Sequence, residues 1–151
     1  MTCDIVLATH NARWIHTSFG LRSLRANLGA LRERCEILEF QLSDWAADVV
    51  EQVLAKQPRI VGVGVYVWNA TQALQVVRAL KQVAKDTVVV IGGPEVSHEA
   101  DQQEICALAD HVVQGEADVA FRELCEQLLR GETPSKCIVA KTPHYTELQS
   151  P

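Results

Sequence analysis

The run Val-Val-Val-Ile-Gly-Gly-Pro at residues 88–94 limits the possible folds of this chain more than any other stretch. Its β-branched residues predict a strand buried on both faces, and the glycine pair lets the backbone turn sharply at its end. Apolar runs at residues 60–67 and 111–113 share this character, and the second leads into Gly115-Glu116. If these strands are parallel, their carboxyl ends meet at one edge, where open α/β sheets bind ligands.

Strands and helices are predicted to alternate along the rest of the chain. Strands are expected at residues 3–9, 36–40, 59–67, 86–91 and 111–113. Helices are expected at residues 18–31, 45–54, 69–83, 99–108 and 118–129, with Thr17 or Ser18 capping the first and Ser43 or Asp44 the second. Right-handed crossovers then place helices on both faces of a parallel sheet. Residues 36–40 alternate polar and apolar, as an edge strand does. The predicted fold class is α/β, a flavodoxin-like or Rossmann-like three-layer sandwich whose five-stranded parallel sheet has the order 2-1-3-4-5.

The character of the sequence changes at residue 132. Thr133-Pro134, Thr142-Pro143 and Ser150-Pro151 interrupt a segment with little periodicity, although residues 137–140 are compatible with a short extra strand. We therefore expect one domain at residues 1–131 and a linker at residues 132–151, leading to a further domain.

Composition argues against several partners. The net charge of −5 disfavours binding to a nucleic-acid backbone, which needs clustered Lys and Arg. The five scattered cysteines form no Cys-x-x-Cys pair and no zinc spacing, which suits a reducing cytoplasm. No leader is evident, and no apolar run approaches the roughly 18 residues of a membrane span. We expect a cytoplasmic chain with neither nucleic-acid nor membrane partners.

The loops at the expected ligand edge lack several known signatures. A long polar segment at residues 10–16 follows the first strand and should face residues 66–69 at the switch point. It contains no Gly-x-Gly-x-x-Gly, no Walker loop and no flavin mononucleotide phosphate loop. Thr9-His10 and Val67-Trp68 stand where a phosphoacceptor receiver domain needs acidic residues. An independent flavodoxin-like enzyme is a weaker interpretation, since no nucleophile and base pair stands out.

Four loop motifs in this order carry a resemblance to a known family. They are residues 11–22, residues 60–69, Gly92-Gly93-Pro94-Glu95, and Gly115-Glu116. Together they resemble the N-terminal cobalamin (vitamin B12)-binding domain of cobalamin-dependent radical SAM proteins. Some of those proteins carry annotation related to magnesium-protoporphyrin IX monomethyl ester oxidative cyclase. The resemblance extends over residues 3–131.

The resemblance implies that cobalamin binds base-off. Its dimethylbenzimidazole nucleotide tail would insert at the sheet edge, and the corrin ring would lie over the loops. Glycines would make room for the tail, and Glu116 would open the last helix. The cofactor-binding residues implied in this way are Asn11, Ile15, His16, Thr17, Ser18, Gly20, Tyr66, Trp68, Asn69, Gly92, Gly93, Pro94, Glu95, Gly115 and Glu116.

The chain departs from cobalamin domains of the methionine-synthase type. It has no Asp-x-His-x-x-Gly after the first strand, and Gly64 stands in place of the serine of Ser-x-Leu. His16, or His10 nearer the strand end, could reach cobalt, but radical SAM relatives generally bind cobalamin without a protein histidine. The other interpretation of His16 is a hydrogen-bonding residue of the pocket. No other metal ligand is expected.

The aromatic residues and Asn69 also have two interpretations each. Trp14, Tyr66 and Trp68 either pack at strand ends or form an apolar wall against the corrin ring. Asn69 is either the cap of the following helix or a contact to the ligand.

Two hypotheses for function follow. In the first, the chain is the cobalamin-binding module of a radical SAM enzyme that performs methyl transfer or another radical modification. Its partner is then a C-terminal radical SAM domain of the same protein, which uses a 4Fe-4S iron–sulfur cluster and S-adenosylmethionine. The chain itself lacks Cys-x-x-x-Cys-x-x-Cys and should catalyse nothing alone. In the second, it is a degenerate flavodoxin-like domain that binds no cofactor and serves as a structural or docking lid for the catalytic domain.

Overall fold

The computed structural model describes residues 3–12 and 18–151. Its strands form one parallel sheet in the order β2-β1-β3-β4-β5-β6. The strands are β1 Ile5–Asn11, β2 Cys35–Gln41, β3 Ile60–Gly64, β4 Val88–Gly92, β5 His111–Gln114 and β6 Cys137–Val139. The predicted fold class and the predicted order of the first five strands are confirmed.

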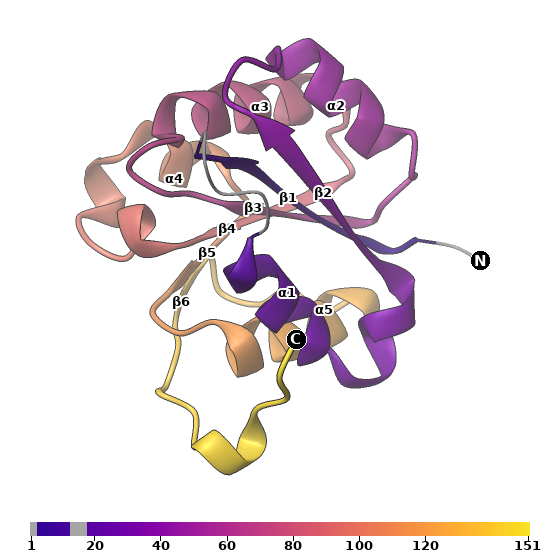
Figure 1. Ribbon diagram of the computed structural model, residues 1–151, viewed down its shortest axis with the longest axis vertical. Coiled ribbons are helices and arrows are strands. Elements are labelled where there is room, and N and C mark those ends of the chain that lie inside the picture. The colour runs from indigo at the N-terminus through magenta and orange to yellow at the C-terminus, as the bar shows by residue number, and fades with distance from the viewer. Residues whose placement is uncertain (1–2, 13–17) are drawn as a thin grey trace.

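Helices cover both faces of the sheet. Figure 1 shows α2, α3 and α4 on one side and α1 and α5 on the other. The α-helices are α1 Phe19–Ala26, α2 Ala46–Leu54, α3 Ala70–Val83, α4 Glu104–Leu108 and α5 Asp118–Leu129. Short 3-10 helices are η1 Gly29–Arg34, η2 Pro94–Val96, η3 Ala100–Gln102 and η4 Tyr145–Glu147. Among the described residues, none of these helices is both long and apolar enough to cross a membrane.

The core is divided into two layers by the alternation of side chains along each strand. In β1, Val6 and Ala8 pack with α2 and α3, whereas Ile5 and Leu7 pack with α1 and α5. Both sets are buried, which explains why the strands read as continuous apolar runs instead of alternating ones.

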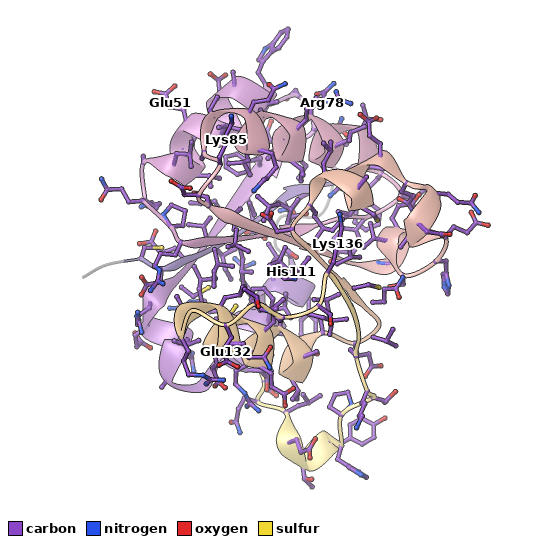
Figure 2. All side chains as sticks on the ribbon, turned by 180° about the vertical axis from the view of Figure 1, so that it is seen from behind. Glu51, Arg78, Lys85, His111, Glu132 and Lys136 are labelled. Atoms are coloured by element: carbon purple, nitrogen blue, oxygen red, sulfur yellow. The ribbon has the colours of Figure 1, made fainter. Side chains whose placement is uncertain are left out.

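The sheet has one strand more than predicted. β6 comes from the segment expected to be a linker, and Val112 of β5 pairs with Cys137. The entry to β6 is held by a hydrogen bond of 2.8 Å between His111 Nδ1 and the Ser135 carbonyl, and by Lys136 Nζ, which donates to the Ala107 carbonyl at 2.9 Å. Figure 2 labels His111 and Lys136 beside this crossing segment.

Three helix predictions need correction. The first helix ends at Ala26, because Gly29 adopts a left-handed φ of 58° and starts a 3-10 helix. The predicted helix at residues 99–108 is α-helical only in α4, since Glu99 also has a left-handed φ and is followed by the 3-10 helix η3. Asp44 does not cap α2; its carboxylate accepts a hydrogen bond from the Gln41 N–H instead. The last helix, residues 118–129, is as predicted.

Candidate functional site

Three glycines leave one face of the sheet without side chains at its carboxyl edge. Gly62 and Gly64 lie two residues apart on β3 and therefore share a face, and Gly92 is the register partner of Gly64 on β4. A Cβ atom at Gly62 would lie 2.7 Å from Leu7 Cδ2 and 3.3 Å from Phe121 Cζ, so this face is turned toward α5. The sheet thus has a bare patch under the α1 and α5 layer.

A cavity of about 270 Å³ lies over this patch. Its floor and walls are largely apolar, with Leu7 and Val90 from the sheet, Leu21 from α1 and Phe121 from α5. Six of the eight glycines of the chain line it: Gly20, Gly62, Gly64, Gly92, Gly93 and Gly115. At Gly62 the missing side chain makes room for Leu7 and Phe121, whereas at Gly92 it leaves open space.

Gly92 and Gly93 differ in why they are glycines. Gly93 has φ 119° and ψ 171°, a conformation that only glycine adopts without strain. A Cβ atom there would lie 2.3 Å from the Val65 carbonyl oxygen. A Cβ atom on Gly92 would meet its nearest neighbour, the Val113 carbonyl oxygen, at an ordinary 3.5 Å. The fold requires Gly93, whereas at Gly92 the missing side chain enlarges the cavity.

Polar side chains are few in the lining. Ser23 Oγ on α1 donates a hydrogen bond of 2.5 Å to Asp118 Oδ1 on α5, across the cavity wall. Tyr66 also lines the cavity, and its ring stacks on Trp68 with centroids 4.5 Å apart and planes 4° from parallel. Trp68 and its neighbour Val67 are exposed, with 42% and 77% of their surfaces accessible. An exposed apolar rim therefore follows the carboxyl end of β3.

Asn69 holds this rim in place through hydrogen bonds to the backbone. It stands at the N-terminus of α3, but its fully buried side chain makes no capping hydrogen bond, so the prediction of a cap is wrong. Its Oδ1 accepts from the Tyr66 N–H at 2.8 Å, and its Nδ2 donates to the His10 carbonyl at 2.9 Å and to Thr9 Oγ1 at 3.1 Å. The end of β1 and the turn after β3 are joined by this one amide.

Glu39 on β2 accepts hydrogen bonds from both ends of the loop that follows β1. Its carboxylate accepts from the Ser18 N–H and from both terminal nitrogens of Arg22, at 2.9 and 3.1 Å. Burial raises the pKa of Glu39, but hydrogen bonds from Arg22, Ser18 and Asn11 outweigh it, and the pKa lies below its usual value. The loop base is thus fixed by a carboxylate that stays ionised.

His10 lies on the opposite face of the sheet from the cavity. Its ring packs 5.8 Å from Phe40, a residue of the core layer under α2 and α3. Burial lowers the pKa of His10, against the Asp44 carboxylate, which raises it. Its Nε2 has no hydrogen-bond partner within residues 3–12 and 18–151. His10 is therefore not part of the cavity wall.

The structure brings together some of the predicted site residues. Those that line the cavity are Gly20, Tyr66, Gly92, Gly93 and Gly115. Those that lie outside its lining are Asn11, Ser18, Trp68, Asn69, Pro94, Glu95 and Glu116. Trp14, Ile15, His16 and Thr17 lie outside the described residues, and with them the proposed histidine ligand of cobalt.

The residues outside the lining have structural positions of their own. Ser18 caps α1, where its Oγ accepts from the Leu21 N–H at 3.2 Å. Pro94 and Glu95 begin η2, and Glu116 is exposed ahead of α5, which starts at Asp118 and not at Glu116. Within the described part of the chain, no three His, Cys, Asp or Glu side chains converge as metal ligands.

Sequence reasoning missed several residues that shape the site. Gly62 and Gly64 could have been recognised, because a Gly-x-Gly inside a strand removes side chains from one face only. Ser23 and Asp118 are 95 residues apart and carry no sequence signal of their contact. The same holds for Glu39, whose partners lie on another element.

Comparisons with solved structures find the same fold in larger proteins. The cobalamin-dependent S-adenosylmethionine radical enzyme OxsB, solved with aqua-cobalamin and S-adenosylmethionine bound, superposes with a TM-score of 0.76 at 13% identity. The match covers 98% of this chain and 24% of OxsB. The radical S-adenosylmethionine methyltransferase TsrM from Kitasatospora setae, with cobalamin and an iron–sulfur cluster bound, gives 0.59 at 18% identity, covering 99% of this chain and 31% of TsrM.

Sequence comparison identifies the family. A curated relative, 2-(S-pantetheinyl)-carbapenam-3-carboxylate methyltransferase from Streptantibioticus cattleyicolor, is 33% identical over 89 residues. That match covers 57% of this chain and only 13% of the relative, so the chain spans a small part of its length. The family profile of the B12 binding domain matches residues 5–125, which include every strand from β1 to β5 and the first two thirds of α5. With most of its sequence and its whole ligand edge inside that match, the chain belongs to the B12 binding domain family.

Proposed function

We propose that this chain binds cobalamin base-off and serves as the cobalamin-binding module of a radical SAM enzyme that transfers a methyl group or performs a related radical modification. The observation that carries the proposal is the glycine-lined cavity between the carboxyl edge of the sheet and the α1 and α5 layer.

The cavity fits the nucleotide tail and not the whole cofactor. Its volume of about 270 Å³ lies just under the roughly 300–1,000 Å³ of pockets for drug-sized ligands. A flat heteroaromatic base needs open space beside a flat surface, and the missing side chain at Gly92 leaves such space next to the sheet. Leu7, Val90 and Phe121 would give the ring the apolar contacts that favour its burial.

The corrin ring would then lie over the exposed rim. Phe19 is 72% exposed at the start of α1, next to the cavity, and Val67 and Trp68 form the neighbouring apolar surface. Exposed apolar side chains gathered at the mouth of a cavity mark a binding surface. A base held under α1 cannot also coordinate the cobalt, which is why the proposed state is base-off. Bound cobalamin would supply a cobalt centre able to carry a methyl group.

The enzymatic part of the proposal concerns a longer protein. The chain spans about a quarter of OxsB and 13% of the carbapenam methyltransferase. A C-terminal radical SAM domain with a 4Fe-4S cluster and S-adenosylmethionine is the partner we propose, in the cytoplasm. The methyltransferase names of two relatives support methyl transfer as its chemistry.

A titration with two corrinoids tests the proposal on the chain itself. Aquacobalamin and cobinamide, which lacks the nucleotide tail, are added to the protein and followed by visible absorbance. We expect saturable binding of both, tighter for cobalamin because only its tail reaches the cavity. Absence of cobalamin binding up to about 1 mM, equivalent to a free energy weaker than about −4 kcal/mol, would refute the proposal. That result would favour the second hypothesis, a degenerate domain that binds no cofactor and serves as a lid. The absence of the axial histidine motif and of the serine motif supports that hypothesis.

A further inference from the structure

We infer that Asp118, supported by Ser23, binds a ribose hydroxyl of the nucleotide tail. The inference rests on the proposed function and assigns a specific contact within the same site. Its basis is the one pair of hydrogen-bonded side chains in the described lining of an otherwise largely apolar cavity.

The pair lies at the mouth of the cavity and not on its floor. Asp118 is the first residue of α5, which begins just past the carboxyl end of β5 at Gln114. Ser23 faces it from α1, one turn after the exposed Phe19. Asp118 is half-buried, so its carboxylate is in reach of a ligand that enters along the edge. A tail whose base fills the apolar floor would place its sugar beside these two residues.

The hydrogen bond between the pair decides what it can recognise. A serine hydroxyl has one proton, and Ser23 donates it to Asp118 Oδ1. The remaining sites are the second carboxylate oxygen and the lone pairs of the serine oxygen, all of which accept hydrogen bonds. The pair therefore matches a ligand group that donates.

The chemistry of the tail leaves the sugar as the matching group. The phosphodiester is an anion and would be repelled by the carboxylate. The dimethylbenzimidazole base, attached through one ring nitrogen, has no N–H to donate. The free ribose hydroxyls are donors, and in Rossmann-type NAD sites an Asp or Glu side chain accepts a hydrogen bond from a ribose hydroxyl in the same way.

A purely structural role is the competing explanation. The Ser23 to Asp118 hydrogen bond joins α1 to α5, and an acidic residue in the first turn stabilises a helix. Such a role would weaken cobalamin by disturbing the cavity wall, and Ser23→Ala, which breaks the same hydrogen bond but keeps the carboxylate, would then weaken cobalamin as much as Asp118→Ala. A ribose contact instead makes Asp118→Ala lose more cobalamin affinity than Ser23→Ala, so comparison of these two variants separates the explanations.

The experiment uses Asp118→Ala and Ser23→Ala, with Glu123→Ala as the matched control. Glu123 is an exposed carboxylate on the same helix and does not line the cavity. Dissociation constants for aquacobalamin and cobinamide, and the melting temperature, are measured for the three variants and for the wild type. We expect Asp118→Ala to weaken cobalamin binding about tenfold, equivalent to about 1.4 kcal/mol, with cobinamide binding and the control unchanged.

Two results would overturn the inference. One is cobalamin binding by Asp118→Ala within about twofold of the wild type, well below a hydrogen bond to a charged group. The other is an equal loss of cobalamin affinity in Ser23→Ala and in Asp118→Ala, which would show that the hydrogen bond between the helices is all that matters. If the wild type itself bound both corrinoids equally, the tail would not use the cavity, and this would refute the inference and the base-off part of the proposed function, while cobalamin binding itself would stand.

Discussion

Gly92→Val and Gly93→Ala should have opposite effects on the stability of the fold, although the two positions are adjacent. Gly92 has no left-handed φ, and its Cβ would make only an ordinary contact of 3.5 Å. A valine there fits the strand and reduces the freedom of the unfolded chain, so the free energy of unfolding should rise by about 0.4–1 kcal/mol. Its methyl groups would enter the cavity, where overlap with a bound ring costs about 1–3 kcal/mol. Cobalamin binding should therefore weaken roughly 5- to 150-fold.

Gly93→Ala should disturb the fold itself. The substitution forces an alanine into a conformation that costs on the order of 1–3 kcal/mol. It also places Cβ 2.3 Å from the Val65 carbonyl oxygen, which belongs to backbone and cannot move aside cheaply. With a total cost of about 3 kcal/mol, the melting temperature should fall by roughly 6–12 °C.

Thermal melts followed by circular dichroism and absorbance titrations with aquacobalamin measure both effects. The expected pattern is a stable Gly92→Val protein that binds poorly and an unstable Gly93→Ala protein. Cobalamin binding by Gly92→Val at the wild-type level would show that the tail does not use this cavity. A Gly92→Val protein that melts as low as Gly93→Ala would show that the distinction between the two glycines is mistaken.

Three further outcomes follow from particular contacts. Asn27 is buried, donates to the Gln149 carbonyl at 3.0 Å and accepts from its N–H at 2.7 Å, so Asn27→Ala should release the C-terminal segment to limited proteolysis while the core stays resistant. The pKa of Glu39 is lowered on folding, so its contribution to stability is complete above about pH 4.5 and is lost as the pH falls through the folded value; the stability of Glu39→Gln should fall less steeply with acid, and a slope equal to that of the wild type would contradict this. Native thiol labelling near neutral pH should modify exposed Cys137 first and spare Cys35, because burial raises the pKa of Cys35 to about 12; mass spectrometry of the labelled peptides distinguishes the two.

The sheet could be predicted because its strands are buried on both faces and leave uninterrupted apolar runs in the sequence. The alternation in residues 36–40 likewise identified β2 as an edge strand. The glycine pair at residues 92–93 marked the ligand edge because it ends such a run. What these signals share is a dependence on neighbours along the chain.

The walls of the cavity depend instead on contacts between distant elements. Ser23 meets Asp118 only because the crossovers bring α1 and α5 together on one face of the sheet. Asn69 has the residue type and position of a helix cap. Its side-chain amide instead hydrogen-bonds the backbone groups at the ends of β1 and β3, and so it does not cap α3. β6 is short and partly exposed, so its three residues carry too weak a pattern to be distinguished from a linker.

The same distant contacts explain why the cavity can stay open without a ligand. Asn69 fixes the turn that carries Tyr66, and the close packing of Gly93 against Val65 fixes the end of β4 beside it. On the other side, Glu39 holds Arg22 and so the first turns of α1. A pocket with its walls braced in this way loses little conformational freedom when it is filled. A loss of affinity in Gly92→Val can therefore be attributed to occupied space, because the walls that surround that space are held by bonds the substitution does not touch.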